Sequence, residues 1–198
     1  KKFMPEPERW PASPEMLDKH FFGNSAGNAR PTRYFAAVEY NYGKAAGAED
    51  FCRKAQLLNI EVNKAMYEGW QHHLWNDASG ILTWMSQSAY PSFVWQTYDY
   101  YYDLNGAYWG VRKACEPLHI QWNPATDEVE VVNYSAGTHK GLTAKVQVLN
   151  MDASVAWEKE ATVDSNEDTT DKCIKLEFPE NLSKVHFIKM TLTEDGKV

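Results

Sequence analysis

The 198-residue sequence has few cysteines, and they form no recognisable disulfide or metal pattern. Cys52, Cys115 and Cys173 are odd in number and lie far apart, so neither a disulfide framework nor a zinc knuckle is expected. We expect buried free thiols. His72 and His73 are adjacent, and neighbouring positions of a helix point about 100° apart, which suits chelation badly. We therefore predict no metal and no cofactor.

Positive charge is also scarce. The chain carries a net charge of −7, has a pI near 5.4 and contains no local cluster of lysine and arginine. Such a chain repels a phosphate backbone, so nucleic acid is not an expected partner. No apolar run approaches the roughly 20 residues needed to cross a bilayer, so no membrane span is expected.

Aromatic residues are abundant, but only in one part of the chain. Residues 1–117 hold 22 of the 27 aromatic residues. Residues 118–198 hold five, together with 14 acidic residues, eight lysines and no arginine. This sharp change near Pro117 predicts two parts of different character, 1–117 and 118–198.

The first part shows the periodicity of helices followed by a strand. Apolar residues recur at helical spacing in residues 32–42 and again in residues 48–74, which predicts two helices. The turn at residues 77–80 precedes a short apolar run, Ile81 to Met85, that is typical of a buried parallel strand. Helix, turn and strand in this order are the repeating unit of a (β/α)8 barrel, whose active site lies at the C-terminal ends of its strands.

The second part alternates apolar and polar residues with period two, and turn residues separate the runs at roughly ten-residue steps. We predict strands at His119–Trp122, Val129–Val132, Ala144–Val148, Cys173–Phe178 and Val185–Leu192. Such spacing indicates an antiparallel β-sandwich of immunoglobulin-like type. Glu194 to Gly196 has the sequence of a type I′ hairpin turn, and only two residues follow it, so a closing strand is expected to be missing.

Nine aromatic residues fall between Tyr90 and Trp109. Aromatic faces stack on the apolar face of a sugar ring, while nearby amides, hydroxyls and carboxylates hydrogen-bond its hydroxyl groups. This density therefore favours a carbohydrate site. The alternative is that the rings pack a core or an interface between domains.

The order of residues around this segment resembles a known family. The stretches TWMSQSAYPSFVWQTYDYYYD and GAYWGVRKACEPLHIQWN contain Trp84, Pro91, the pair Tyr98–Asp99, the turn Gly106 to Gly110 and the run Ala114 to Gln121. This series resembles the end of the catalytic barrel and the entry to the next domain in glycoside hydrolase family 2. The closest likeness is to its exo-β-D-glucosaminidase and β-mannosidase branch. The resemblance implies a C-terminal fragment, with the end of a TIM-barrel domain in 1–117 and an immunoglobulin-like sandwich in 118–198.

The resemblance also implies a function. Enzymes of this branch hydrolyse β-linked glucosaminides or mannosides with retention, without a cofactor, using two carboxylates about 5 Å apart. Neither carboxylate is expected here, because the pair Asn166-Glu167 lies in an acidic, threonine-rich loop of the sandwich. The catalytic pair and a signal peptide would lie upstream of Lys1, in a periplasmic or secreted protein. The implied partners are a β-linked oligosaccharide or glycoside and the remaining domains of the same polypeptide.

Five residues are predicted to bind the sugar. Trp84 ends the predicted strand and is expected to be a stacking platform, and Gln87, Ser88 and Tyr90 follow it directly. Trp95 serves either the sugar or the core. Two alternatives stay open for the chain as a whole: a non-catalytic carbohydrate-binding module with an exposed aromatic platform, and a structural domain whose rings seal an interface. Asp99 and Asp103 flank the tyrosine run, and for them we expect a structural role, capping turns or bonding tyrosine hydroxyls, rather than binding of sugar hydroxyls.

Overall fold

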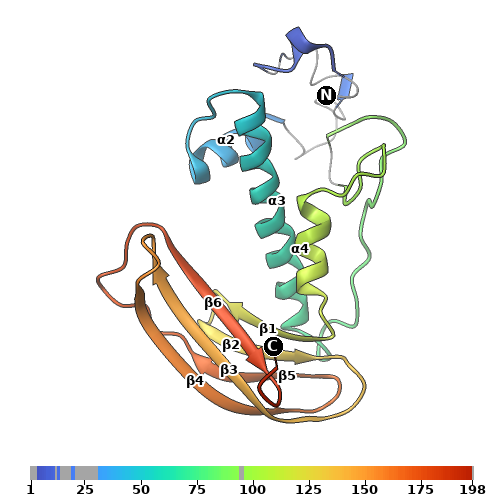
Figure 1. Ribbon diagram of the computed structural model, residues 1–198. Helices are drawn as coiled ribbons and strands as arrows, with labels where there is room; N and C mark the ends of the chain where they lie inside the picture. The colour runs from blue at the N-terminus through green and yellow to red at the C-terminus, as the bar shows by residue number, and fades with distance from the viewer. Residues whose placement is uncertain (1–3, 12, 14–18, 21–30, 94–95, 198) are drawn as a thin grey trace. The chain divides into compact units, whose positions relative to one another are not determined.

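The computed structural model describes residues 4–11, 13, 19–20, 31–93 and 96–197. It combines helices with antiparallel sheets (Figure 1). The chain divides into two compact units, the first made of Lys1–Ala65 and Leu82–Lys113 and the second of Met66–Ile81 and Ala114–Val198. The domain division at residue 117 stays a prediction. In the described part of the chain, no helix has the length and apolar character needed to span a membrane.

The first unit is helical. A short 3-10 helix, η1 (Glu6–Glu8), precedes α2 (Pro31–Tyr42), α3 (Ala48–Gln71) and α4 (Gly106–Ala114). The two helices predicted at 32–42 and 48–74 are confirmed, and α3 begins with acidic residues that suit the positive end of its dipole. The last turn of α3 belongs to the second unit, as does Ala114.

The apolar stripes of α2 and α3 pack on each other. Val38, Ala55 and Leu58 are buried and form the core of this contact. The Tyr34 hydroxyl donates a hydrogen bond of 2.8 Å to the Ala55 carbonyl oxygen, and burial raises the pKa of Tyr34 to about 12. Each helix therefore covers part of the apolar side of the other, which stabilises both amphipathic helices.

The helix α4 approaches α3 closely at two glycines. A Cβ atom on Gly106 would lie 2.2 Å from the Gln56 carbonyl oxygen, and one on Gly110 would lie 2.3 Å from the Ile60 carbonyl oxygen. No real Cβ contact is this short, so only glycine allows the two backbones to come together at these positions. The Gly106 N–H also donates to the Gln56 side chain at 2.5 Å.

The second unit is built from two three-stranded antiparallel sheets (Figure 1). One sheet has the order β1-β2-β5 and the other the order β4-β3-β6. The strands are β1 (Leu118–Asn123), β2 (Glu128–Asn133), β3 (His139–Asn150), β4 (Val155–Ser165), β5 (Thr169–Lys175) and β6 (His186–Thr193). The five predicted strand regions correspond to β1, β2, β3, β5 and β6, and β4 was not predicted.

The two sheets share one apolar core. Val129 of β2 and Ile174 of β5 belong to the same buried cluster as Ala144, Val146 and Val148 of β3. The alternation along β3 follows from this arrangement, because every second side chain of a strand points to the same face. The turn after β6 is of the predicted type I′ kind. Asp195 and Gly196 both have positive φ, and the backbone N–H groups of Glu194 and Lys197 each donate to the carbonyl oxygen of the other residue.

The strand predicted at Ile81–Met85 was wrong. The segment is not assigned to any strand, and Leu82 is fully exposed. A parallel strand is stable only when neighbouring strands satisfy its backbone groups, and no partner strand lies beside this segment among the described residues. The apolar run in the sequence does not show whether a partner strand is present.

Candidate functional site

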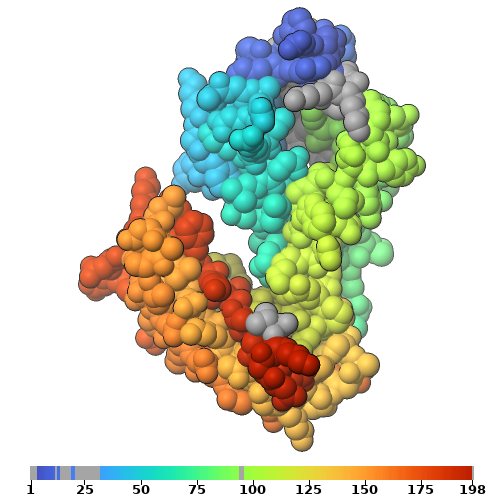
Figure 2. Space-filling model, viewed as in Figure 1, coloured from blue at the N-terminus to red at the C-terminus, as the bar shows by residue number. Residues whose placement is uncertain are grey.

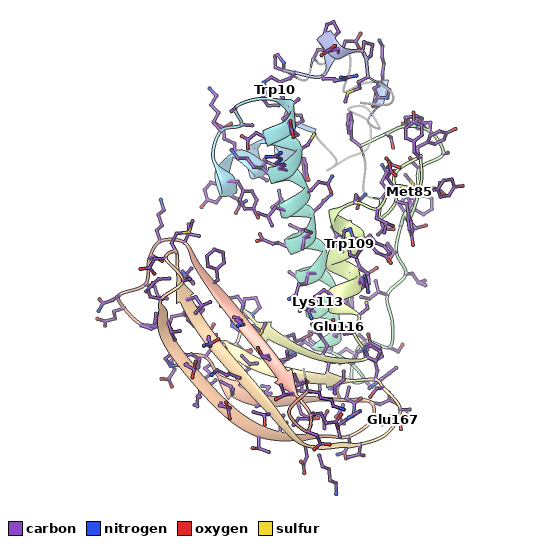
Figure 3. The ribbon with its side chains drawn as sticks, viewed as in Figure 1. Trp10, Met85, Trp109, Lys113, Glu116 and Glu167 are labelled. Atoms are coloured by element: carbon purple, nitrogen blue, oxygen red, sulfur yellow. The ribbon has the colours of Figure 1, made fainter. Side chains whose placement is uncertain are left out.

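The loop of the first unit that precedes α4 is described at residues 82–93 and 96–105, and it carries most of the aromatic cluster. Of the five predicted sugar-binding residues, Trp84, Gln87, Ser88 and Tyr90 lie in this loop, and Trp95 lies outside the described residues. The loop lies on the surface, in yellow-green in Figure 2, and Met85 is labelled on it in Figure 3.

The predicted residues differ in exposure. Trp84 is 78% exposed and Tyr90 is 40% exposed, so both rings face solvent. Gln87 is partly buried, whereas Ser88 is buried and its Oγ has no hydrogen-bond partner among the described residues. A buried hydroxyl without a hydrogen bond lowers the stability of the folded state, so Ser88 is the one of these four residues whose environment is unfavourable.

Backbone hydrogen bonds tie the two halves of the loop together. The Ser86 carbonyl oxygen accepts hydrogen bonds from the backbone N–H groups of Thr97 and Tyr98, at 3.0 and 2.9 Å. Gln87 and Tyr98 consequently form an isolated bridge. A further bridge pairs Tyr98 with Leu104, so the backbone of Tyr98 lies between those of Gln87 and Leu104. Of the predicted site residues, Gln87 is thus held beside the tyrosine run.

The tyrosine run is the tip of a small hairpin. Tyr98 and Leu104 pair in antiparallel fashion, and the backbone of Asp99 donates to the Asp103 carbonyl oxygen at 3.0 Å. The Tyr102 N–H donates to the Asp99 carbonyl oxygen at 3.0 Å, and Tyr102 has a φ of 65°. These features match a three-residue hairpin loop whose last residue is left-handed.

Asp99 holds this turn through its side chain. Its Oδ1 accepts hydrogen bonds from the backbone N–H groups of Tyr101 and Asp103, at 2.7 and 2.9 Å. An aspartate that bonds the backbone two residues ahead is a common way to stabilise a turn. The expectation that Asp99 caps a turn is confirmed.

All three residues of the hairpin tip are tyrosines, and together they surround a hollow. Tyr100, Tyr101, Tyr102 and Gln87 line an open hollow of about 550 Å³ on the first unit. The rings of Tyr100 and Tyr101 meet edge to face, with centroids 5.3 Å apart and planes at 88°. Tyr102 is 74% exposed at the rim. The left-handed position usually takes glycine or asparagine, so tyrosine there costs about 1 to 3 kcal/mol.

The C-terminal end of the loop is anchored to α4. Asn105 accepts a hydrogen bond from the Ala107 N–H at 2.9 Å, which is the contact of a helix cap. The Asn105 amide also donates to the Gln96 carbonyl oxygen at 2.6 Å, and Gln96 in turn donates to the Ser92 carbonyl oxygen at 2.8 Å. With Gly106 against α3, these bonds give the hairpin a fixed base.

A second polar cluster lies within the second unit, where the end of α3 meets the first sheet. His119 Nε2 lies 2.7 Å from Glu68 Oε1, and Gln121 donates to the Glu68 carbonyl oxygen at 3.0 Å. Glu130, which is fully buried, accepts from Gln121 at 3.2 Å and lies 3.0 Å from His72 Nδ1. His119 and Gln121 belong to the hinge run Ala114 to Gln121. Each buried carboxylate therefore has a histidine partner, as buried charges require.

The described residues contain no group of three His, Cys, Asp or Glu side chains that could hold a metal ion. Glu167, labelled in Figure 3, lies in the turn between β4 and β5 and accepts a hydrogen bond from the Gly137 N–H at 3.2 Å. Its role there is to support a loop of the sandwich. Glu116, also labelled, lies 3.5 Å from His119 Nδ1 in the second unit.

The sequence indicated the aromatic loop, but it did not indicate the hollow that Gln87 and the three tyrosines line. The tyrosines at positions 100, 101 and 102 were treated as part of the aromatic cluster, and only their flanking aspartates were assigned a role. The signal that would have identified the turn is an Asp-x-x-x-Asp spacing around the tyrosines, because aspartate commonly opens such turns. The prediction of buried thiols was wrong for Cys52 and Cys115, which are free but exposed. Burial raises the pKa of Cys173 to about 11.

Comparison with curated proteins gives several relatives. The chain is 39% identical over 132 residues to an exo-β-D-glucosaminidase of Streptomyces avermitilis, a match that covers 65% of this chain and 15% of that protein. It is 37% identical over 129 residues to an exo-β-D-glucosaminidase of Amycolatopsis orientalis, covering 64% and 12%. A mannosylglycoprotein endo-β-mannosidase of Lilium longiflorum is 35% identical over 118 residues, covering 60% and 12%. The chain thus matches only a small share of each relative's length. Comparison with models of protein families found no match.

Solved structures resemble the chain over most of its length. A complex of the Amycolatopsis orientalis exo-chitosanase with PNP-β-D-glucosamine gives a TM-score of 0.82 at 30% identity and covers 88% of this chain and 21% of that one. A β-D-mannosidase from Dictyoglomus thermophilum gives a TM-score of 0.80 and covers 99% and 24%. At 19% identity the second likeness concerns the fold alone. Folds similar to that of this chain thus occur within larger proteins.

Proposed function

The chain is homologous to part of the exo-β-D-glucosaminidases and β-mannosidases of glycoside hydrolase family 2, and from this premise we propose that it supplies one wall of the sugar pocket of a retaining β-glycosidase. The intact protein would hydrolyse β-linked glucosaminides or mannosides by a double displacement. The observation that carries the proposal is the 39% identity over 132 residues to an exo-β-D-glucosaminidase. The likeness in fold to an exo-chitosanase at a TM-score of 0.82 supports it.

We propose a domain assignment to go with this function. Residues 1–117 would be the C-terminal part of a TIM-barrel catalytic domain, and residues 118–198 an immunoglobulin-like sandwich. Two antiparallel sheets around one core support the second assignment. The first rests on the resemblance, since Leu82–Met85 lacks strand pairing among the described residues. In an intact barrel, neighbouring strands from elsewhere in the polypeptide would satisfy its backbone groups.

The exposed loop residues would form the wall. Trp84 presents a largely exposed indole, which suits stacking on the apolar face of a pyranose ring. Gln87 and Tyr90 offer an amide and a phenol for sugar hydroxyls, and the unsatisfied Ser88 hydroxyl would gain a partner there. Trp95 would be a second stacking surface.

The chain alone would be inactive. Retaining hydrolysis needs two carboxylates about 5 Å apart across the scissile bond. The resemblance assigns both to strands that this chain does not match, and Glu167 supports a loop of the sandwich. We expect no turnover of a nitrophenyl β-glucosaminide or β-mannoside by the purified chain above the buffer rate; measurable turnover would overturn this part of the proposal.

The role of the wall is tested in the intact enzyme. We expect Trp84→Ala to lower kcat/KM for a nitrophenyl β-glucosaminide by about 100-fold or more, because a stacked aromatic ring contributes through both packing and orientation. The melting temperature should stay unchanged, since Trp84 packs on little of the unit. The matched control is Trp75→Ala, which removes an exposed tryptophan outside the loop and should leave kcat/KM unchanged. Equal effects of the two substitutions would contradict the assignment.

A second candidate function is a non-catalytic carbohydrate-binding module. The exposure of Trp84, Tyr90 and Tyr102 on one loop favours it, because such modules bind sugars on open aromatic platforms. A binding module would retain its affinity for oligosaccharide when isolated, and its tryptophan fluorescence would titrate. A wall of a larger pocket would bind weakly and would recover affinity only within the whole protein.

A further inference from the structure

We propose that the hollow lined by Gln87 and the three tyrosines of the hairpin tip is a carbohydrate subsite of its own, with Tyr102 as its principal stacking ring. The proposal rests on the proposed function for the class of ligand, a β-linked oligosaccharide. It goes beyond that function in assigning a site to Tyr100, Tyr101 and Tyr102, which lie outside the predicted pocket wall.

The shape and lining of the hollow suit a sugar ring. Its volume of about 550 Å³ lies within the range of small-molecule sites. Aromatic faces for stacking and an amide with both donor and acceptor atoms, on Gln87, are present together. Tyr100 and Tyr101 stand at 88° to each other, so one ring can form the floor while the other closes a side.

The backbone of Tyr102 is the second observation. Its φ of 65° is a conformation that bulky residues rarely adopt, and glycine or asparagine would fit this position of the hairpin without strain. The surrounding hydrogen bonds nevertheless hold Tyr102 there, with its ring 74% exposed. Strain of this kind is concentrated at ligand clamps.

The hairpin is rigid enough to serve as such a clamp. Asp99 fixes both sides of the tip through its side chain and its backbone, and the base is tied to Ser86 on one strand and to Asn105 on the other. A preformed arrangement lowers the entropy lost when a ligand binds. The hollow would therefore hold one ring of the oligosaccharide without a large rearrangement of the hairpin.

The test is a titration of the 198-residue chain with a β-1,4-linked glucosamine tetramer and, separately, with β-1,4-linked mannotetraose. Binding is followed by NMR of ring-labelled tyrosine. We expect saturable shifts of the tyrosine signals with at least one of the two sugars, and the preferred sugar identifies the class of substrate. Absence of saturable shifts with both sugars would overturn the proposal.

Variants locate the site. Tyr102→Gly keeps the left-handed turn but removes the ring, and we expect roughly tenfold weaker binding with a higher melting temperature, because the strain of a left-handed tyrosine is relieved. Tyr102→Asn, which also tolerates this backbone, should behave in the same way. The matched control is Tyr40→Ala, which removes a tyrosine that is 90% exposed on α2 and should bind as the unaltered chain does. Unchanged binding by both Tyr102 variants, or an equal loss with Tyr40→Ala, would overturn the assignment.

Trp84→Ala separates this subsite from the pocket wall. If Tyr102→Gly weakens binding while Trp84→Ala does not, the subsite is supported. The role of Trp84 in the pocket wall is then decided by kcat/KM of Trp84→Ala in the intact enzyme. If only Trp84→Ala weakens binding, the wall is supported and the tyrosine subsite is wrong.

Discussion

Two glycines, Gly106 and Gly110, decide at the residue scale how closely α4 approaches α3. They stand one helical turn apart on the same face of α4, and each meets a backbone carbonyl of α3 where a side chain would be. The loop that carries the candidate site ends at Gly106. The position of the tyrosine hairpin therefore depends on the absence of two side chains.

We predict that Gly110→Ala lowers the free energy of unfolding by about 1 to 3 kcal/mol, because the added methyl group would overlap the Ile60 carbonyl group and push the helices apart. Urea denaturation followed by circular dichroism measures the change. The matched control is Gly69→Ala in α3, where an added Cβ atom meets nothing within 4 Å. Alanine should stabilise that helix by up to about 1 kcal/mol. Equal destabilisation by both substitutions would contradict the close approach.

In the sequence, Gly106 and Gly110 stand out only as members of an ordered series of motifs. The sequence does not show that α3 approaches the backbone at both positions. A glycine in a sequence indicates a backbone with few restrictions, and it does not name the chain segment that approaches it. The partners, Gln56 and Ile60, lie 50 residues earlier on another helix. The same holds for Tyr102, because its left-handed backbone is imposed by Asp99 and the hairpin and contradicts the preference of tyrosine.

At the scale of elements, the buried cluster of Glu68, His119, Gln121 and Glu130 joins the end of α3 to β1 and β2. These four side chains bond one another or the α3 backbone, and all four are buried. Alternation along β1 correctly placed His119 and Gln121 on one face of a strand. The buried face of a strand is usually apolar. Two polar side chains can occupy this face of β1 because Glu68 of α3 provides hydrogen-bond partners for both.

We predict that Glu130→Ala lowers the free energy of unfolding by about 3 to 5 kcal/mol, because it removes the fully buried carboxylate of the polar cluster. Gln121 keeps the Glu68 carbonyl oxygen as an acceptor but loses the carboxylate, and His72 loses its carboxylate partner. Thermal denaturation provides the measurement. The matched control is Glu158→Ala on β4, which removes an exposed partner of Lys145 and should leave the midpoint unchanged within error. A change at Glu130 no larger than that at Glu158 would show that the cluster contributes little.

At the scale of the whole molecule, the two units differ in how they are held together. The second unit has a core shared by two sheets, with β2 and β3 side chains fully buried. The described part of the first unit has a smaller buried cluster between α2 and α3, and its loop Leu82–Asn105 is fastened mainly by hydrogen bonds. Apolar side chains on α3, including Val62, Met66 and Trp70, are exposed at helical spacing.

We predict that amide hydrogen exchange follows this difference. The amides of β2 and β3 should exchange most slowly, by global unfolding, and those of residues 82–93 should exchange fastest, because few apolar contacts protect them. Mass spectrometry of peptic peptides after exchange measures both regions in one sample. Protection of residues 82–93 as strong as that of β3 would contradict the difference between a unit with a large apolar core and a loop that is fastened mainly by hydrogen bonds.

The turn expected at Gly106 to Gly110 is part of the helix α4, so the sequence did not predict this helix. By itself the sequence determined where α2 and α3 lie, roughly where five of the six strands lie, and which family the chain is related to. These features depend on the spacing of residues within short windows, and a sequence displays such spacing directly. Only the tertiary structure decided that Ile81–Met85 belongs to no strand of the described part of the chain, that three tyrosines surround a hollow, and that Glu68 meets His119 across 51 residues. Each of these depends on groups that are close in space and distant along the chain, and the periodicity of a single segment carries no record of them.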